Sequence, residues 1–253
     1  MTTPIRVVMC DVDGVITRGE GQPVDLSIIT RLASLNRAAV ADSSALAVTL
    51  CTGRQAPYVE LMAQLTETFL PCIFEHGAGL FFPRAFRYEF TVTAGYAARL
   101  SALRSALEPE LLATGRAFVQ PGKEATMTLY PLSVTLDSVF QEASAIVARE
   151  APEFDVARNV LGVEIRPHGT DKAVGLRRIA NLLEMSLESF AGVGDSDPDL
   201  GFLRLCAFSA APANATPAVR AAVDYVSPSA FGAGLLDILH RLNQRHPQPP
   251  DQS

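Results

Sequence analysis

Short apolar runs separated by polar turn clusters dominate the beginning of the chain. The runs at residues 6–10, 45–51 and 72–75 are continuous and largely apolar, a pattern typical of strands that are buried on both faces. Helical patterns occupy residues 25–40 and the segment that follows Pro57. Because strands and helices alternate on short connections, we expect a doubly wound parallel sheet.

The pattern changes after Pro83 and returns near Lys172. Between these positions the strand candidates alternate in polarity, and the order helix–strand–strand occurs twice. This alternation is typical of an antiparallel sheet that is covered by helices on one face. The sequence therefore predicts an α/β fold. Residues 1–83 and 169–253 form its Rossmann-like core, and residues 84–168 form an inserted α+β cap.

Composition narrows the functional classes. The 253 residues are 48% hydrophobic and carry a net charge of −6, so a large core is available and a nucleic-acid partner is disfavoured. No apolar segment approaches the ~18 residues that span a bilayer, and no signal-peptide pattern is visible. The four cysteines form no C-x-x-C pair, which argues against zinc. We expect a reduced, cytoplasmic protein without a membrane partner.

Two acids, Asp11 and Asp13, directly follow the first predicted strand and precede Gly14. Alternate residues of a strand point the same way, so both carboxylates reach the edge where open α/β sheets bind ligands. Carboxylates held this close repel each other unless a cation lies between them or one is protonated, and Mg²⁺ prefers oxygen ligands. The same residues also suit an ordinary turn.

Three further polar clusters follow predicted strands or begin helices. They are Thr52-Gly53-Arg54 after the second strand, Lys172 at a helix start, and Asp195 with Asp199 after a later strand. Taken singly, these suit a strand-end hydroxyl, a surface lysine and an acidic helix cap. Taken together, at one edge of one sheet, they favour a functional site.

The combined set suits phosphoryl transfer. Asp11 would attack phosphorus, and Asp13 would protonate the leaving oxygen and then activate water. Thr52 and Gly53 would donate hydrogen bonds to phosphate oxygens, and Lys172 would neutralise charge. The expected ligands of Mg²⁺ are four carboxylates, those of Asp11, Asp13, Asp195 and Asp199.

These motifs resemble the haloacid dehalogenase-like hydrolase superfamily, in the branch with a large mixed cap inserted after the third core strand. The resemblance covers nearly the whole chain. It implies a Mg²⁺-dependent phosphatase that acts on a small phosphorylated metabolite through an aspartyl phosphate, as a monomer or homodimer. Relatives with this cap act on sugar phosphates, phosphoglycolate, mannosyl phosphoglycerate or sucrose phosphate. The segments that match are Asp11-Val12-Asp13-Gly14-Val15, Thr52-Gly53-Arg54, Lys172 and Gly194-Asp195-Ser196 with Asp199.

Residues of the cap select the substrate in proteins of this kind. The resemblance favours Glu164 and Arg166, together with Arg54 of the core, as substrate-binding residues. Other cap candidates are more typical of solvated strand positions, and these are Lys123, Glu124 and Arg158. Two positions depart from the family pattern, because Pro198 and His76 stand where relatives often carry Asn.

Other functions remain as alternatives. A sugar phosphomutase of the same superfamily would share the cap and the acids but would transfer phosphate without net release. A signalling receiver is about half this length, and its phospho-acceptor lies on a different strand from its acidic pair. A non-catalytic binding protein would be expected to have lost one of the motif acids, and none is lost.

Overall fold

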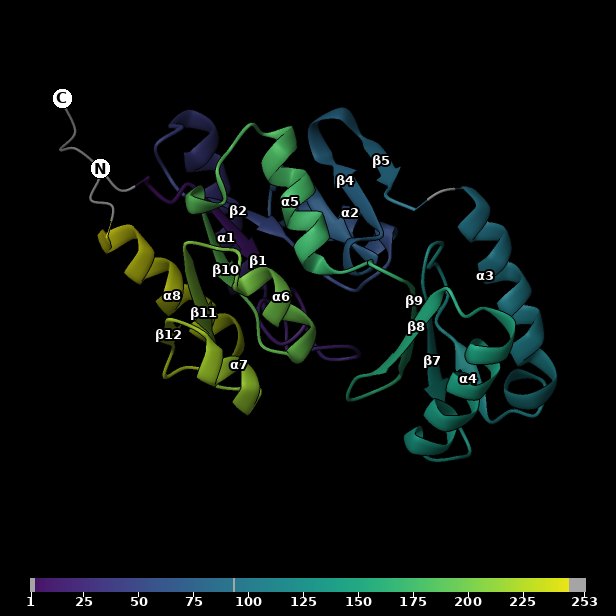
Figure 1. Cartoon of the computed structure of the whole chain (residues 1–253). Coiled ribbons are helices and arrows are strands. Elements are labelled where there is room, and N and C mark those ends of the chain that lie inside the picture. Colours follow the sequence, from purple (N-terminus) through teal and green to yellow (C-terminus); the bar gives the residue numbers. More distant parts are fainter. Residues whose placement is uncertain (1–2, 93, 246–253) are drawn as a thin grey trace, which may run out of the picture.

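A five-stranded parallel sheet forms the centre of the larger lobe (Figure 1). The computed structural model describes residues 3–92 and 94–245. Along the sheet the strand order is β12-β11-β10-β1-β2, and every neighbouring pair is parallel. The strands are β1 (Val7–Cys10), β2 (Ala47–Leu50), β10 (Phe190–Val193), β11 (Phe208–Ala211) and β12 (Tyr225–Val226).

Helices cover both faces of this sheet, as the doubly wound pattern predicts. One face packs against α1 (Leu26–Ala41), α2 (Ala56–Leu65) and α8 (Phe231–Arg245). The other face packs against α5 (Lys172–Leu182), α6 (Leu200–Leu203) and α7 (Pro217–Ala222). The expected α/β fold class is therefore confirmed.

The third predicted strand leads into a small antiparallel sheet of its own. This sheet has the order β3-β4-β5 and comprises β3 (Cys72–Phe74), β4 (Gly79–Phe82) and β5 (Arg87–Phe90). A single parallel bridge between Cys51 and Ile73 places β3 beside the end of β2. The predicted start of the cap at residue 84 thus falls in the turn between β4 and β5. Strand β5 stays with the core, because it pairs with β4 and because Tyr88 stacks on Phe81 at 4.8 Å.

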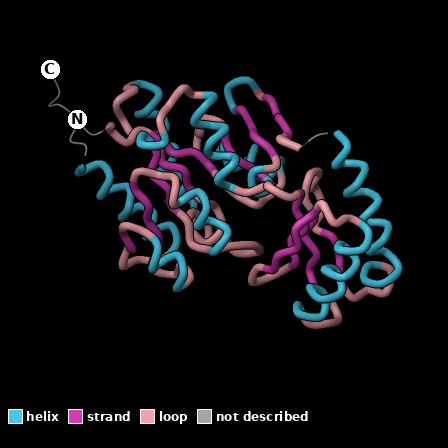
Figure 2. The backbone as a smooth tube through the Cα atoms, viewed as in Figure 1, coloured by secondary structure: helices cyan, strands magenta, loops and turns pink. Residues whose placement is uncertain are grey.

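A second sheet with two helices on one face forms the smaller lobe (Figures 1 and 2). Its strand order is β6-β7-β9-β8, all antiparallel, which matches the repeated helix–strand–strand pattern. Its elements are α3 (Ala94–Leu107), β6 (Ala117–Val119), β7 (Met127–Pro131), α4 (Leu136–Glu150), β8 (Phe154–Arg158) and β9 (Val163–Pro167). We call residues 94–168 the cap lobe, and residues 3–92 with 169–245 the core lobe.

Side chains alternate along β9, so one face of the cap sheet packs on the cap helices and the other face points toward the core lobe. Val163 and Ile165 pack against the helices in the apolar cluster of the cap lobe. Glu164 lies between them in the strand, so its side chain leaves from the opposite face. That face lines the space between the two lobes.

Candidate active site

The predicted site residues of the core meet in one cleft between the lobes. Asp11 directly follows β1, Thr52 follows β2, and Asp195 follows β10, so all three lie at the carboxyl edge of the parallel sheet. Lys172 joins them from the first turn of α5. The cleft has a volume of about 670 Å³, and residues of both lobes line it.

Lys172 is the centre of the buried charges. Its Nζ lies 2.9 Å from Asp11 Oδ1 and 2.5 Å from Asp199 Oδ1. The side chain of Lys172 is only 3% exposed. Burial alone would lower the pKa of Lys172, but the charges of Asp11 and Asp199 outweigh it and raise that pKa well above its usual value. Lys172 is therefore an ammonium ion that bridges two carboxylates, as expected of the predicted cation.

Three acids at this point form a set of oxygen ligands. Carboxylate oxygens of Asp11, Asp195 and Asp199 all lie within 4.8 Å of one another. Asp195 Oδ1 is buried and has no hydrogen-bond partner among the described residues. Burial, assisted by the charge of Asp199, raises the pKa of Asp195 to about 7 and that of Asp11 well above its usual range. An unpartnered oxygen and repelling carboxylates are what a hard divalent cation would satisfy, so these residues fit Mg²⁺.

A glycine allows the first strand loop to lie against this cluster. Gly14 has a φ of +86°, and a Cβ on it would lie 2.1 Å from Asp195 Oδ2. Asn214 Nδ2 donates to the carbonyl oxygen of Gly14 at 2.9 Å, which holds the loop in place. The sequence Asp-Val-Asp-Gly is thus more than a turn here, since any larger residue at position 14 would displace Asp195.

Asp199 organises the second acidic loop from within. Its Oδ2 accepts hydrogen bonds from the backbone N–H groups of Asp195, at 2.9 Å, and Ser196, at 3.0 Å. Pro198 lies in the short helical turn Asp197–Asp199, where the first N–H groups have no intrahelical partner. The missing N–H of Pro198 is therefore tolerated in this turn.

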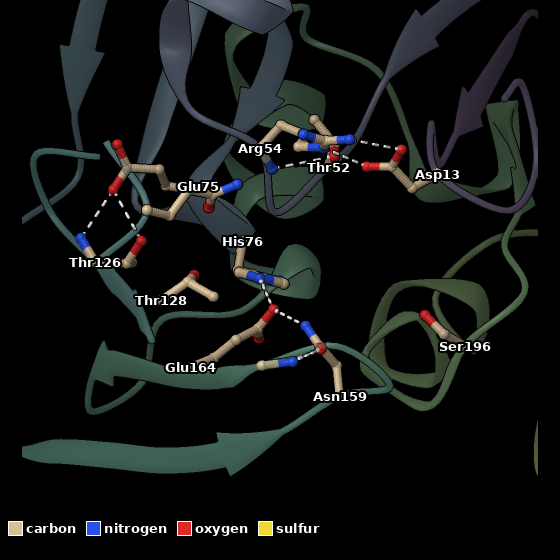
Figure 3. A network of polar contacts seen from close by, with 12 residues as sticks. Asp13, Thr52, Arg54, Glu75, His76, Thr126, Thr128, Asn159, Glu164 and Ser196 are labelled. Atoms are coloured by element: carbon tan, nitrogen blue, oxygen red, sulfur yellow. Dashed lines mark hydrogen bonds and ion pairs between the residues drawn. The ribbon is translucent and has the colours of Figure 1, made fainter. Parts of the chain in front are cut away.

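Asp13 lies apart from the three clustered acids. Its carboxylate accepts from Arg54 Nε at 2.6 Å and from Arg54 Nη2 at 3.1 Å (Figure 3). It also accepts from Thr17 Oγ1 at 3.1 Å. Arg54 in turn lies 3.3 Å from Glu20 Oε1. The structure places the Asp13 side chain beside Arg54, and its role as a metal ligand stays a prediction.

The phosphate-binding residues predicted after β2 lie at the same edge. Thr52 is buried, and its Oγ1 accepts from the backbone N–H of Arg54 at 3.1 Å. A Cβ on Gly53 would lie 2.1 Å from His76 Nε2, so only glycine fits between the two segments. Thr52, Gly53 and Arg54 all line the cleft.

On the opposite wall, His76 of the core meets Glu164 of the cap (Figure 3). His76 Nε2 lies 2.9 Å from Glu164 Oε1, and Asn159 Nδ2 donates to the same oxygen at 2.8 Å. Burial lowers the pKa of His76, although the charge of Glu164 acts to raise it. Glu164 lines the cleft as predicted, whereas Arg166, the next outward-facing residue of β9, does not belong to the lining.

Sequence reasoning missed two acids that join the lobes. Glu75 was not among the predicted site residues, yet it is fully buried and accepts four hydrogen bonds from the cap lobe. Glu20 accepts from Gln120 Nε2 at 3.1 Å and from the hydroxyl of Tyr130. The available signal for Glu75 was an acid at the last position of a predicted buried strand, and no local pattern distinguishes Glu20.

Comparisons with known proteins agree with this geometry. A family model for haloacid dehalogenase-like hydrolases matches residues 136–239. A phosphoglycolate phosphatase of Natronomonas pharaonis is 28% identical over 241 residues, which cover 95% of this chain and 98% of that protein. Over residues 136–239 this chain is similar to the haloacid dehalogenase-like hydrolases, and its similarity to the phosphatase extends along nearly the whole chain.

Two further comparisons bear on this hydrolase. A phosphoglycolate phosphatase of Methanothrix thermoacetophila is 34% identical over 88 residues, which span 35% of this chain and 40% of that protein. A solved haloacid dehalogenase-like hydrolase from Bacteroides thetaiotaomicron has a TM-score of 0.73 and 14% identity, and covers 94% of this chain and 99% of its own. The solved protein supports the fold. The two curated relatives support a place for this hydrolase among the phosphoric monoester hydrolases.

A helix that crosses a membrane has to be both long and predominantly apolar. Among the described residues, no helix is both long enough and apolar enough to cross a membrane.

Proposed function

We propose that this hydrolase is a Mg²⁺-dependent phosphatase that cleaves a small phosphomonoester, of the size of phosphoglycolate, through an aspartyl phosphate. The observation that carries the proposal is the buried ammonium ion of Lys172, which lies between Asp11 and Asp199. Next to it is the unpartnered oxygen of Asp195. A phosphate dianion entering the cleft meets a cation, a nucleophile and a metal-ligand set at one point.

Asp11 is the nucleophile in this proposal. Its Oδ1 accepts from Lys172 Nζ at 2.9 Å and from the backbone N–H of Val12 at 2.7 Å. No described residue donates a hydrogen bond to Oδ2, so that oxygen remains available to attack phosphorus. Burial raises the pKa of Asp11, and the charge of Lys172 opposes this shift. Lys172 thus favours the ionised form that attack requires.

Asp13 moves the protons. It would give a proton to the leaving oxygen while the bond from phosphorus to that oxygen breaks. It would then take a proton from the water that attacks the aspartyl phosphate, which frees Asp11 and releases inorganic phosphate. Since Arg54 now holds both Asp13 oxygens, one of them must leave Arg54 when substrate enters.

The metal would be held by the clustered acids Asp11, Asp195 and Asp199. When bound, it supplies positive charge that offsets the repulsion between the nucleophile and the phosphate. Asp199 already fixes Lys172 and the loop at Asp195, so it orders both the cation and the ligands.

The names of the relatives support a choice between substrate classes. Two curated relatives are named phosphoglycolate phosphatases, and one of them aligns along nearly its whole length. We therefore place phosphoglycolate ahead of sugar phosphates as the substrate.

A phosphate-release assay tests the proposal. Phosphoglycolate, sugar phosphates and p-nitrophenyl phosphate would each be supplied with Mg²⁺ and with excess EDTA. Release from at least phosphoglycolate with Mg²⁺, and its loss in EDTA, is expected. Equal release in EDTA would contradict the metal dependence, and absence of release from every ester would contradict phosphatase activity. Transfer between sugar positions without release would instead indicate a phosphomutase.

A further inference from the structure

The chain uses lysine very sparingly. Only two of its 21 lysine and arginine residues are lysines, Lys123 and Lys172. Both line the same cleft, Lys172 from the core lobe and Lys123 from the cap lobe. The first is paired with the acids of the catalytic cluster, and no such role accounts for the second.

Lys123 is a cation without an acidic partner. Its Nζ donates to Thr128 Oγ1 at 2.6 Å, and this is its only polar contact in the part of the chain that the structure describes. An ammonium group has three donors, so two remain. Thr128 also lines the cleft, so the pair presents donors toward the space where substrate would lie.

The acids nearest to Lys123 are occupied by other donors. Glu164 is held by His76 and Asn159, and Glu20 by Gln120, Tyr130 and Arg54. Glu75 accepts from the backbone and the hydroxyl of the loop itself. None of these acids lies within 4.0 Å of Lys123 Nζ. A carboxylate of a bound substrate would therefore accept the hydrogen bonds that no described residue accepts from Lys123.

The loop that carries Lys123, residues 120–126, is fixed to the core beside the phosphate-binding segment. Glu75 accepts from the backbone N–H groups of Glu124 and Ala125, both at 2.9 Å, and from that of Thr126 at 2.8 Å. Figure 3 shows the contact with Thr126. Gly122 has a φ of +84°, and a Cβ there would lie 3.4 Å from Gln55 Cγ, one residue beyond Arg54. Lys123 thus lines the same cleft as Thr52, Arg54 and Lys172, and its loop lies against the segment that follows Arg54.

We propose that Lys123, positioned by Thr128 and by the clamp at Glu75, binds a carboxylate of the substrate and so selects short phosphomonoesters that carry a second anionic group. This inference rests on the phosphatase activity proposed above. It identifies the cap residue that distinguishes phosphoglycolate from an uncharged ester of the same length.

Burial is consistent with this role. It lowers the pKa of Lys123, and the acids Glu164, Glu75 and Glu20 only partly oppose the shift. A carboxylate bound next to the ammonium group would favour its charged form.

Kinetics with a matched pair of substrates test the proposal. Phosphoglycolate and ethyl phosphate differ by the carboxylate alone. In Lys123→Met the ratio of kcat/KM for phosphoglycolate to that for ethyl phosphate should fall about 10–100-fold, as for loss of a charged hydrogen bond. Arg104→Met is the control, because it removes a cation from the exposed surface of α3, away from the cleft, and should leave the ratio unchanged.

The outcomes separate this inference from the proposed function. An unchanged ratio in Lys123→Met, or an equal loss with both esters, would overturn the role of Lys123 while leaving the phosphatase proposal intact. Absence of hydrolysis by the unaltered protein would overturn the phosphatase proposal itself.

Lysine labelling gives a second readout that needs no change at Lys123. In Asp11→Asn, which should not turn substrate over, trinitrobenzenesulfonate labelling would be followed at the peptide that contains Lys123. Phosphoglycolate should protect this lysine, whereas ethyl phosphate or inorganic phosphate at the same occupancy should not. Equal protection by all three would contradict a carboxylate contact at Lys123.

Discussion

The core wall and the cap wall of the cleft hold their charged groups in different ways. On the core wall the partners belong to one lobe, since Lys172, Asp11 and Asp199 contact one another at the edge of the parallel sheet. On the cap wall the contact between ionisable groups crosses between the lobes, from His76 of the core to Glu164 of the cap. The first arrangement is fixed by the fold of the core alone, and the second forms only when the lobes meet.

The two walls therefore have different roles: residues of the core wall carry out the reaction, and contacts between the lobes determine which substrate is preferred. Changes on the core wall remove a nucleophile, a proton donor or a metal ligand, so they should act on turnover with every substrate. Changes at the contacts between lobes should act on the position of residues 120–126, and therefore on substrate preference. The network Asp13–Arg54–Glu20–Tyr130 joins the two walls and is where this separation is weakest.

The largest effect is expected on the core wall, for Asp13→Asn. Loss of a general acid and base lowers rates by ~10²–10⁴-fold, so hydrolysis of phosphoglycolate should fall by this factor. A nitrophenolate leaves without a proton, so the first step with p-nitrophenyl phosphate should largely survive. Stopped-flow absorbance should show a nitrophenolate burst near one equivalent of enzyme, followed by slow turnover. Hydrolysis of phosphoglycolate at the unaltered rate would contradict the role of Asp13.

A smaller effect is expected for Glu75→Ala, which removes contacts between the core lobe and the cap lobe. The change leaves the N–H groups of residues 124–126 without their acceptor. Loss of such an acceptor lowers the free energy of unfolding by about 1–3 kcal/mol. The KM for phosphoglycolate should rise about 10-fold, with a smaller change in kcat, and Tm should fall by roughly 5 °C. Steady-state kinetics and a thermal melt provide both measurements.

Glu184→Ala is the matched control for Glu75→Ala. Glu184 also has a positive φ, +52° against +46° for Glu75, but its side chain is exposed. Equal effects of the two changes would mean that the backbone conformation matters, and the clamp would have no role of its own.

The last prediction concerns the stability of the unaltered protein, which should depend on Mg²⁺ and pH. Without metal, the pKa of Asp195 is raised to about 7 from 3.8, so the folded protein binds an extra proton between these pH values. Stability of the metal-free protein should therefore rise as the pH falls below 7. Saturating Mg²⁺ should raise Tm by about 5–10 °C at pH 8 and much less at pH 5, where protons compete. An equal increase in Tm at both pH values would place the ion elsewhere.

The same comparison explains which features could be predicted from sequence. Asp11, Thr52, Lys172 and Asp195 follow strands or begin a helix, and parallel strands bring such positions to one edge, so local patterns were sufficient. The order of elements in the cap lobe was likewise readable from alternation. The assignment of β5 was not, because an exposed edge strand alternates in the same way whether it joins the core or the cap.

Contacts between the lobes could not be predicted from local sequence patterns, because they join residues that lie far apart in the chain. Glu20 contacts Gln120 and Tyr130, which lie 100 and 110 residues further along the chain. Glu75 contacts a loop whose position depends on how the lobes dock. The pairing of Asp13 with Arg54 lies within the core lobe, but it also joins residues from two different strand ends, and each looked free to bind metal or phosphate beside its own strand.

The most direct test of the account is the site of phosphorylation. Asp13→Asn would be mixed with p-nitrophenyl phosphate and Mg²⁺, quenched in acid, digested and examined by mass spectrometry. One phosphoryl group is expected on the peptide that contains Asp11, present in Asp13→Asn and absent when Asp11 is also changed to Asn. A phosphoryl group on another residue, or turnover without any phosphorylated protein, would contradict it.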